Sequence, residues 1–256
     1  MDDSNRVAVV VPCFNEEAGL PALARTLQSV QAAWAGRFQF HFILVDDGSI
    51  DSTWDLLKQL FQPWPNCTLV RHTYNRGITA ATLTGFRQAG TVAVCAIDSD
   101  GSYDLQELGR MIPLLSEGVD LVTASPYHPA GGVRHIPGWR LWLSRASSAL
   151  YRRVLRQKLH TYTSCFRVYR RSAVLDLPLR ETGFQGIAEI LARLDLQGSK
   201  IVEYPTVLDV RKFGQSKMKV LRTIGGHLRL LSRLIVLRWF GPAPVKMVSL
   251  PASRAA

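Results

Sequence analysis

Short runs of apolar, β-branched residues alternate with stretches of helical periodicity through the first half of the chain. The apolar runs lie at residues 7–12, 40–46, 67–72, 91–98 and 120–125, and the helical stretches between them at residues 16–34, 51–61, 77–89 and 104–117. Such runs are typical of buried strands. Because strands that alternate with helices pack as a mostly parallel, doubly wound sheet, we expect an α/β fold with helices on both faces. Asp51 and Asp104 are placed to cap two of the helices.

Polar clusters follow the expected strands at their carboxyl ends. They are "PCFNEE" after the first strand, "DDGSID" after the second, "NRG" after the third and "DSDGS" after the fourth. Ligands of open parallel sheets bind at that edge. The pattern therefore predicts one binding site built from four loops.

The second half of the chain has a different sequence pattern. It reads as a basic amphipathic helix at 139–156, a strand-like stretch at 163–171, a helix at 184–197, a strand at 200–210 and a final basic helix at 217–240. That last helix is long enough to span a membrane, but it carries Arg222, Arg229, Arg233 and Arg238. Four arginines are costly in hydrocarbon, so the pattern favours a helix lying on an anionic membrane, with a core-packing or partner-binding helix as the alternative. We expect a catalytic domain over residues 1–215, then a membrane-proximal helix and disordered tail over 216–256.

Charge is divided between the halves. Residues 1–126 hold 8 Lys and Arg against 14 Asp and Glu, and residues 127–256 hold 23 against 6, which gives −6 and +17. An acidic half suits a cation or a hydroxyl-rich ligand, and a basic half suits phosphates, nucleic acid or an anionic membrane. No nucleic-acid-binding module is recognisable, so nucleic acid is not an expected partner. The four cysteines form no CxxC pair and no signal peptide is apparent, which favours a cytoplasmic protein.

The pair Asp98 and Asp100 most directly indicates chemistry. Two carboxylates at the end of a buried strand repel each other unless a cation neutralises them. Hard oxygen ligands select Mg²⁺ or Mn²⁺, which complete their shell with phosphate oxygens and water. The spacing does not fit a calcium-binding EF-hand loop. The turn at Asp46 and Asp47 could accept hydrogen bonds from a nucleobase or ribose, or be a solvated turn with a helix cap.

Four blocks of sequence carry a family resemblance. In order and spacing, "VVVPCFNEEAGL", "ILVDDGSIDST", "NRGITAATLTGFRQA" and "AIDSDGSYD" resemble the nucleotide-sugar-binding half of inverting family 2 glycosyltransferases, which have the Rossmann-like GT-A fold. The later "TSCFRVYRR" and "RKFGQSK" resemble the polyprenyl-phosphate (dolichyl-phosphate) mannosyltransferase-like group. The resemblance covers about residues 7–220.

The resemblance implies a role for each matching position. The nucleoside pocket would be lined by Pro12, Phe14, Glu16, Val45 and Asp47. The diphosphate would lie against Asp98, Ser99, Asp100 and Ser102, with Asp98, Asp100 and Ser102 as the metal site and Asp100 as the direct ligand. Arg211 and Lys217 would hold phosphates, and metal, Arg and Lys together would stabilise the charge of the leaving diphosphate.

Three positions depart from the family pattern. Ser102 stands where many members have Gln, and Pro126 stands where an arginine is frequent, which leaves Arg140 as a remaining contact for phosphate or sugar. Thr161 replaces an aspartate of the pattern Asp-x-x-Ser-Gly-Phe. Thr161 has no carboxylate, so this position lacks the aspartate that could act as a base.

The expected reaction is transfer of a hexose, with mannose favoured, from a nucleotide-diphosphate sugar to a polyprenyl phosphate with inversion. GDP-mannose is the favoured donor and a UDP-sugar is possible. An anionic phosphate acceptor needs positioning more than a base, whereas a hydroxyl acceptor would need one, for which Glu189 is the candidate. The alternatives are a glycan or soluble hydroxyl acceptor, or a non-catalytic nucleotide-sugar-binding protein.

The basic half also predicts peripheral attachment to the cytoplasmic face of a membrane. Headgroups or the acceptor phosphate are expected to meet Arg152, Arg153, Arg156, Arg167, Arg170 and Arg171. Trp139, Trp142 and Trp239 are candidates for the interface, with burial in the core as the alternative for each.

Overall fold

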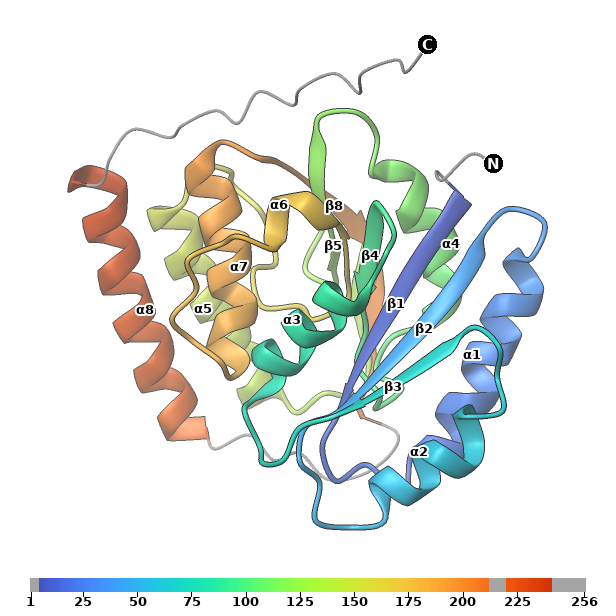
Figure 1. Cartoon of the computed structure of the whole chain (residues 1–256). Helices are drawn as coiled ribbons and strands as arrows, with labels where there is room; N and C mark the ends of the chain where they lie inside the picture. Colours follow the sequence, from blue (N-terminus) through green and yellow to red (C-terminus); the bar gives the residue numbers. More distant parts are fainter. Residues whose placement is uncertain (1–4, 212–219, 241–256) are drawn as a thin grey trace.

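A computed structural model describes residues 5–211 and 220–240, and it places a seven-stranded sheet at the centre of the molecule (Figure 1). The strand order is β3-β2-β1-β4-β7-β5-β8. The bounds are β1 Arg6–Cys13, β2 Gln39–Asp46, β3 Cys67–Arg71, β4 Ala93–Ala96, β5 Val119–Ser125, β7 Arg167–Arg170 and β8 Lys200–Pro205. Only β7 runs antiparallel to its neighbours in this sheet. The mostly parallel sheet predicted from the sequence is confirmed.

Helices cover both faces of the sheet. They are α1 Leu20–Trp34, α2 Thr53–Phe61, α3 Ile78–Gln88, α4 Leu108–Met111, α5 Gly138–Val154, α6 Arg171–Val174, α7 Phe184–Gln197 and α8 Val220–Phe240. One core forms where α1, α2 and α4 pack on one face, and a second where α3, α5, α7 and α8 lie on the other. The two-faced burial explains why β1 is apolar at every position from Val7 to Val11: Val7 and Val9 enter one core, whereas Ala8 and Val10 enter the other.

Two expected elements are shorter or divided. The helix expected at 104–117 is a single α-helical turn, α4, between the 3₁₀ turns η2 Leu105–Glu107 and η3 Ile112–Leu114. Pro113 lacks the backbone N–H that a continuing helix needs, which accounts for the break. The strand expected at 200–210 divides into β8 and β9 Val207–Leu208, and β9 pairs with β6 Gly132–Val133 in a small second sheet.

The last helix packs on the rest of the domain. Its residues Leu230, Leu231 and Leu234 are buried against the core that α5 and α7 share, and Figure 1 shows α8 as the outer layer on that side. Arg233 forms an ion pair of 2.7 Å with Glu181, and Arg238 donates to the carbonyl of Val154 at the end of α5. Such packing supports the core-packing alternative for this helix.

The other side of α8 exposes apolar residues. Leu228, Ile235, Val236, Trp239 and Phe240 are all exposed. Among the described helices, none is long and apolar enough to cross a bilayer. The boundary expected at 215/216 lies outside the described residues, so it stays a prediction.

Candidate active site

A cavity of about 570 Å³ opens at the carboxyl ends of β1, β2 and β4. It is lined by ten of the residues singled out in the sequence: Pro12, Phe14, Glu16, Asp47, Asp98, Ser99, Asp100, Ser102, Arg140 and Arg211. They come from four separate loops and from α5. The strand-end clusters of the sequence thus meet in one place, as the topology of a parallel sheet requires.

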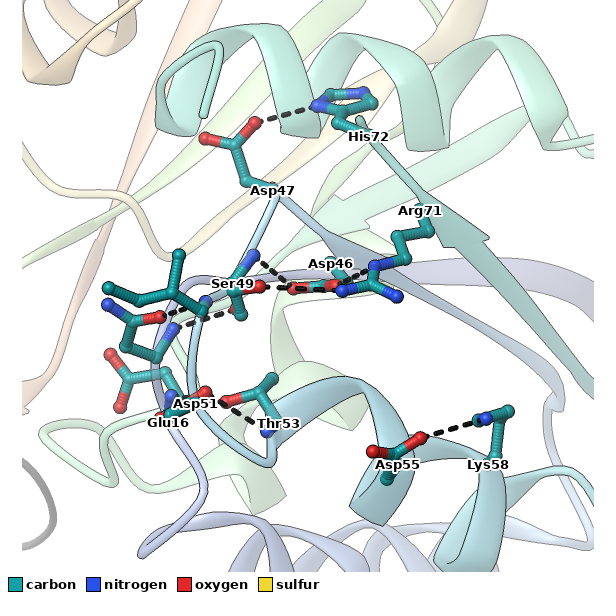
Figure 2. A network of polar contacts seen from close by, with 12 residues as sticks. Glu16, Asp46, Asp47, Ser49, Asp51, Thr53, Asp55, Lys58, Arg71 and His72 are labelled. Atoms are coloured by element: carbon teal, nitrogen blue, oxygen red, sulfur yellow. Dashed lines mark hydrogen bonds and ion pairs between the residues drawn. The ribbon is translucent and has the colours of Figure 1, made fainter. Parts of the chain in front are cut away.

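The turn after β2 ties three loops together (Figure 2). The carboxylate of Asp47 accepts hydrogen bonds from His72 Nδ1 at 2.6 Å, from the backbone N–H of Arg76 at 2.9 Å and from that of Gly77 at 2.7 Å. Its neighbour Asp46 accepts from the Ser49 N–H and pairs with Arg71 at 3.0 Å. Asp47 lines the cavity, but its two oxygens already hold the loop that leads into α3.

The loop after β1 is held against the same turn. The backbone N–H of Asn15 donates to Ser49 Oγ at 2.9 Å, and Asn15 Oδ1 accepts from the N–H of Ile50. The N–H of Glu16 donates to Thr53 Oγ1 at 2.7 Å. These bonds fix the backbone of Glu16, whose carboxylate forms an ion pair with Arg211 from the far end of the chain.

The loop after β4 carries the two aspartates. Asp100 Oδ1 accepts from the N–H of Ser102 at 3.0 Å, and Asp100 Oδ2 lies 3.7 Å from Arg211 Nε. Burial, and after it the charge of Asp100, raises the pKa of Asp98 to about 7. Cys165 and Arg211 oppose that shift. Because these two carboxyl groups lie close together and Asp98 is buried, a nearby positive charge would stabilise their ionised forms.

A divalent cation fits this donor set. Within the described residues, no three or more His, Cys, Asp or Glu side chains are arranged to hold a metal ion by themselves. Mg²⁺ and Mn²⁺ do not need such a cage, because one or two carboxylates together with substrate phosphates complete their shell. Asp98 and Asp100 are suited to that role, with the Ser102 hydroxyl beside them.

Two sequence-predicted site residues among the described residues do not line the cavity. Val45 is fully buried and faces the core on the α3 side of the sheet. Glu189 is buried in α7, where its Oε2 accepts from the N–H groups of Arg180 and Glu181 at 2.9 Å, and its Oε1 pairs with Arg193. This position corrects the expectation that Glu189 takes a proton from an acceptor hydroxyl. Lys217 lies outside the described residues.

The far wall of the cavity has no strong sequence signal. It is formed by Tyr127, Ser144, Thr161, Thr163, Ser164, Cys165, Gly183 and Phe184, among others. These residues come from the loop before β7, the end of β5, helix α5 and the start of α7, which the sheet brings together only in three dimensions. The available signals were the "TSCFRVYRR" stretch, quoted above for its family resemblance, and Thr161, named above as a departure from the family pattern.

An apolar groove of about 280 Å³ continues from the cavity between α5 and α8. Its apolar walls are Trp139, Leu143, Leu150, Ile224, Leu228 and Leu231. Arg140, Ser144, Thr163 and Phe184 line both the cavity and the groove. The cavity that holds the charged residues and the apolar groove are therefore adjacent, and these four residues lie between them.

The arginines of the basic half divide by position. Arg152, Arg153 and Arg156 are exposed. Of the other three, only Arg167 is buried, and Arg170 and Arg171 are half-buried and bonded to the protein. Arg167 is fully buried, Arg170 pairs with Asp120 at 3.5 Å, and Arg171 donates to the carbonyl of Phe86. Trp139, Trp142 and Trp239 are all exposed, at 52%, 68% and 57%, which decides against core burial for each.

Comparisons with known proteins agree on one family for this chain. The family model "Glycosyl transferase family 2" matches residues 8–177. The chain is 32% identical over 222 residues to a polyprenol monophosphomannose synthase of Mycolicibacterium smegmatis, covering 84% of this chain and 82% of that protein. It is 28% identical to a dolichol-phosphate mannosyltransferase of Pyrococcus furiosus, covering 92% of this chain but only 65% of that longer protein.

Solved structures share the fold. A mannosyltransferase from Pyrobaculum calidifontis, in complex with GDP-Man and Mn²⁺, superposes with a TM-score of 0.62 at 19% identity, over 89% of this chain and 64% of that one. A glucosyl-3-phosphoglycerate synthase from Mycobacterium tuberculosis, in complex with Mn²⁺, UDP and phosphoglyceric acid, gives 0.63 at 20% identity, over 96% and 82%. The predicted GT-A-like α/β arrangement is confirmed by these neighbours.

Proposed function

The chain belongs to glycosyltransferase family 2, and we propose that it transfers a hexose, with mannose favoured, from a nucleotide-diphosphate sugar to a polyprenyl phosphate at a membrane surface. The donor would be GDP-mannose, with a UDP-sugar as the alternative. The relatives named above support the lipid acceptor and the mannosyl group. The observation that carries the proposal is the continuity of the acidic cavity with the apolar groove between α5 and α8.

The cavity side of the site suits the donor. Pro12, Phe14 and Glu16 would line the nucleoside part, beside the turn that Asp47 holds in place. Asp98 and Asp100 would hold a Mg²⁺ or Mn²⁺ ion on the diphosphate, which neutralises charge on the leaving group when bound. Arg211, whose Nε lies 3.7 Å from Asp100 Oδ2, would stabilise that charge as it develops.

The groove side suits a lipid phosphate. Transfer of an isoprenoid chain from water into an apolar groove is favourable because it removes apolar surface from water. Arg140 lines both the groove and the cavity. A soluble sugar hydroxyl would gain nothing from the groove. It would also need a general base, and Glu189 faces the backbone of residues 180 and 181 instead of the cavity.

The reaction follows from this arrangement. An oxygen of the acceptor phosphate attacks the anomeric carbon on the face opposite the diphosphate, the new C–O bond forms, and the bond from the anomeric carbon to the diphosphate oxygen breaks. The electron pair leaves with the nucleoside diphosphate. Since the acceptor phosphate is already anionic near neutral pH, no protein group has to remove a proton.

We further propose that the protein is bound peripherally at the cytoplasmic face of the membrane. The exposed Trp139 and Trp142 of α5 and the exposed Trp239 of α8 are suited to the headgroup region. The exposed arginines at the end of α5 would attract an anionic surface. Binding to vesicles that contain anionic lipid, and its loss when Trp139 and Trp142 are both replaced by Ser, would test this part.

The function is tested by following radiolabel into lipid. Purified protein receives a short-chain polyprenyl phosphate, Mg²⁺ or Mn²⁺, and in turn GDP-mannose, UDP-glucose and UDP-N-acetylglucosamine. We expect label in the organic phase with GDP-mannose. The label should be lost in Asp100→Ala and kept in Asp104→Ala, because the Asp104 carboxylate caps η2 and does not line the cavity. Nucleotide binding without lipid labelling would instead favour a hydroxyl acceptor or a non-catalytic binder.

A further inference from the structure

The loop of residues 160–165 forms the junction between the donor cavity and the apolar groove. Thr161, Ser164 and Cys165 line the cavity, and Thr163 lines both the cavity and the groove. The loop has no regular secondary structure and connects the region after α5 to β7. Its position therefore sets how an acceptor held in the groove meets the donor.

A single carboxylate on a neighbouring strand holds the start of this loop. Glu203 of β8 accepts at Oε1 from the N–H of His160 at 2.8 Å and from the N–H of Thr161 at 3.1 Å. The same oxygen accepts from Ser125 Oγ at 2.6 Å, and Oε2 lies 2.8 Å from His160 Nδ1. Ser125 Oγ also lies 3.0 Å from Thr161 Oγ1. Glu203 thus holds the backbone of Thr161 directly and its side chain through Ser125.

The other side of the loop is held by a buried arginine. Arg167 donates to the carbonyl of Tyr162 at 2.7 Å and to the carbonyl of Ile187 in α7 at 2.6 Å. The loop is therefore held from β8 on one side and from β7 and α7 on the other. Glu203 itself does not line the cavity, so any effect it has on the reaction passes through the loop.

We propose that Glu203 is a positioning residue for the acceptor: it fixes the junction loop so that a phosphate at the mouth of the groove is aligned with the donor sugar. The inference rests on the proposed function for the identity of the acceptor. A carboxylate suits this task because one oxygen accepts from two adjacent backbone N–H groups and a hydroxyl, while the other faces His160. Glutamine keeps one accepting oxygen but carries no charge, so Glu203→Gln weakens the bonds from the two N–H groups and the hydroxyl without changing the size of the side chain.

The chain offers a matched control in Asp195. This buried carboxylate of α7 accepts from the N–H groups of Arg156 and Gln157 at 2.7 and 2.8 Å, which also lie in the connection after α5. Neither Arg156 nor Gln157 lines the cavity or the groove. Asp195→Asn therefore removes the same kind of bond from a part of the connection that does not form the junction.

The experiment compares the two variants in the lipid-labelling assay. We expect Glu203→Gln to raise the KM for polyprenyl phosphate on the order of tenfold, since small misplacements of reacting groups are costly, and to leave the KM for the donor unchanged. Asp195→Asn should change neither KM, although both variants should unfold at a lower temperature than the wild type. Equal effects of the two variants on the acceptor KM would overturn the inference.

A second readout separates this inference from the proposed function. Amide hydrogen exchange at residues 160–165 should be faster in Glu203→Gln than in the wild type and unchanged in Asp195→Asn. Failure of the wild-type protein to label any lipid would overturn the proposed acceptor. Unchanged exchange at 160–165 in Glu203→Gln would overturn the positioning role whatever the acceptor.

Discussion

Replacing Asp47 with Asn should destabilise the protein even when no nucleotide is bound. The Asp47 side chain is 3% exposed and accepts hydrogen bonds from His72, Arg76 and Gly77, which all lie in the connection between β3 and α3; Figure 2 shows the bond with His72. Asparagine keeps the shape but has one accepting oxygen, and its amide group would face an N–H donor. The expected consequence is loss of at least one charge-assisted bond and one unsatisfied buried donor.

The size of the effect can be estimated from these contacts. A hydrogen bond to a charged group contributes about 1.5–3 kcal/mol, and a buried donor left unsatisfied costs about 1–3 kcal/mol. Since some relaxation of the loop is expected, we predict a loss of roughly 3 kcal/mol in the free energy of unfolding. For a chain of this size that corresponds to a fall of roughly 6–12 °C in Tm.

Thermal and urea unfolding followed by circular dichroism would measure the loss, with Asp55→Asn as the control. Asp55 lies in the neighbouring helix α2 and pairs with Lys58 at 2.9 Å, but its side chain is 78% exposed. Its replacement should leave Tm close to that of the wild type. If Asp47→Asn lowers Tm no more than Asp55→Asn, the hydrogen bonds of the Asp47 carboxylate do not stabilise the fold.

Three further changes test other parts of the structure. Gly48→Ala should cost at least about 2 kcal/mol, measured by urea unfolding, because Gly48 has φ +71° and a Cβ would lie 2.4 Å from the backbone of residue 74. Leu234→Ala should cost about 3 kcal/mol, because this side chain of α8 is 1% exposed, whereas Leu228→Ala at 54% exposure should cost far less. Burial lowers the pKa of His227, so the folded state disfavours its protonation; stability should fall as pH drops below the ordinary value of about 6.5, and His227→Gln should flatten that slope in unfolding titrations.

The sheet and the donor side of the site could be predicted because local patterns determine them. A parallel strand buried on both faces is apolar at nearly every position, as in the run from Val7 to Val11, so it stands out from its surroundings. The residues after each strand then gather at one edge by topology alone. For that reason Glu16, Asp47 and Asp100 meet in one cavity although they lie in separate motifs.

The side of the cavity next to the groove could not be predicted because it depends on contacts between distant segments. The junction loop is placed by Glu203 from β8 and Arg167 from β7, and neither residue belongs to a recognisable motif for that task. Glu189 is the reverse case, a residue that the sequence suggested for the site and that the fold directs elsewhere. Its helix was predicted at the observed bounds, but only the fold reveals that the carboxylate faces the backbone of residues 180 and 181.

The fold also changes what the charge of the second half means. The excess of +17 in residues 127–256 suggests a broadly basic surface, yet several of its arginines act inside the protein. Arg167 is buried in the sheet, Arg211 meets Glu16 and Asp100 in the cavity, and Arg233 and Arg238 fasten α8 to the domain. The charge left to attract a membrane is therefore smaller than the sequence count. Apolar contact through α5 and α8 must supply a larger share of any binding, and such binding should persist at salt concentrations that screen exposed arginines.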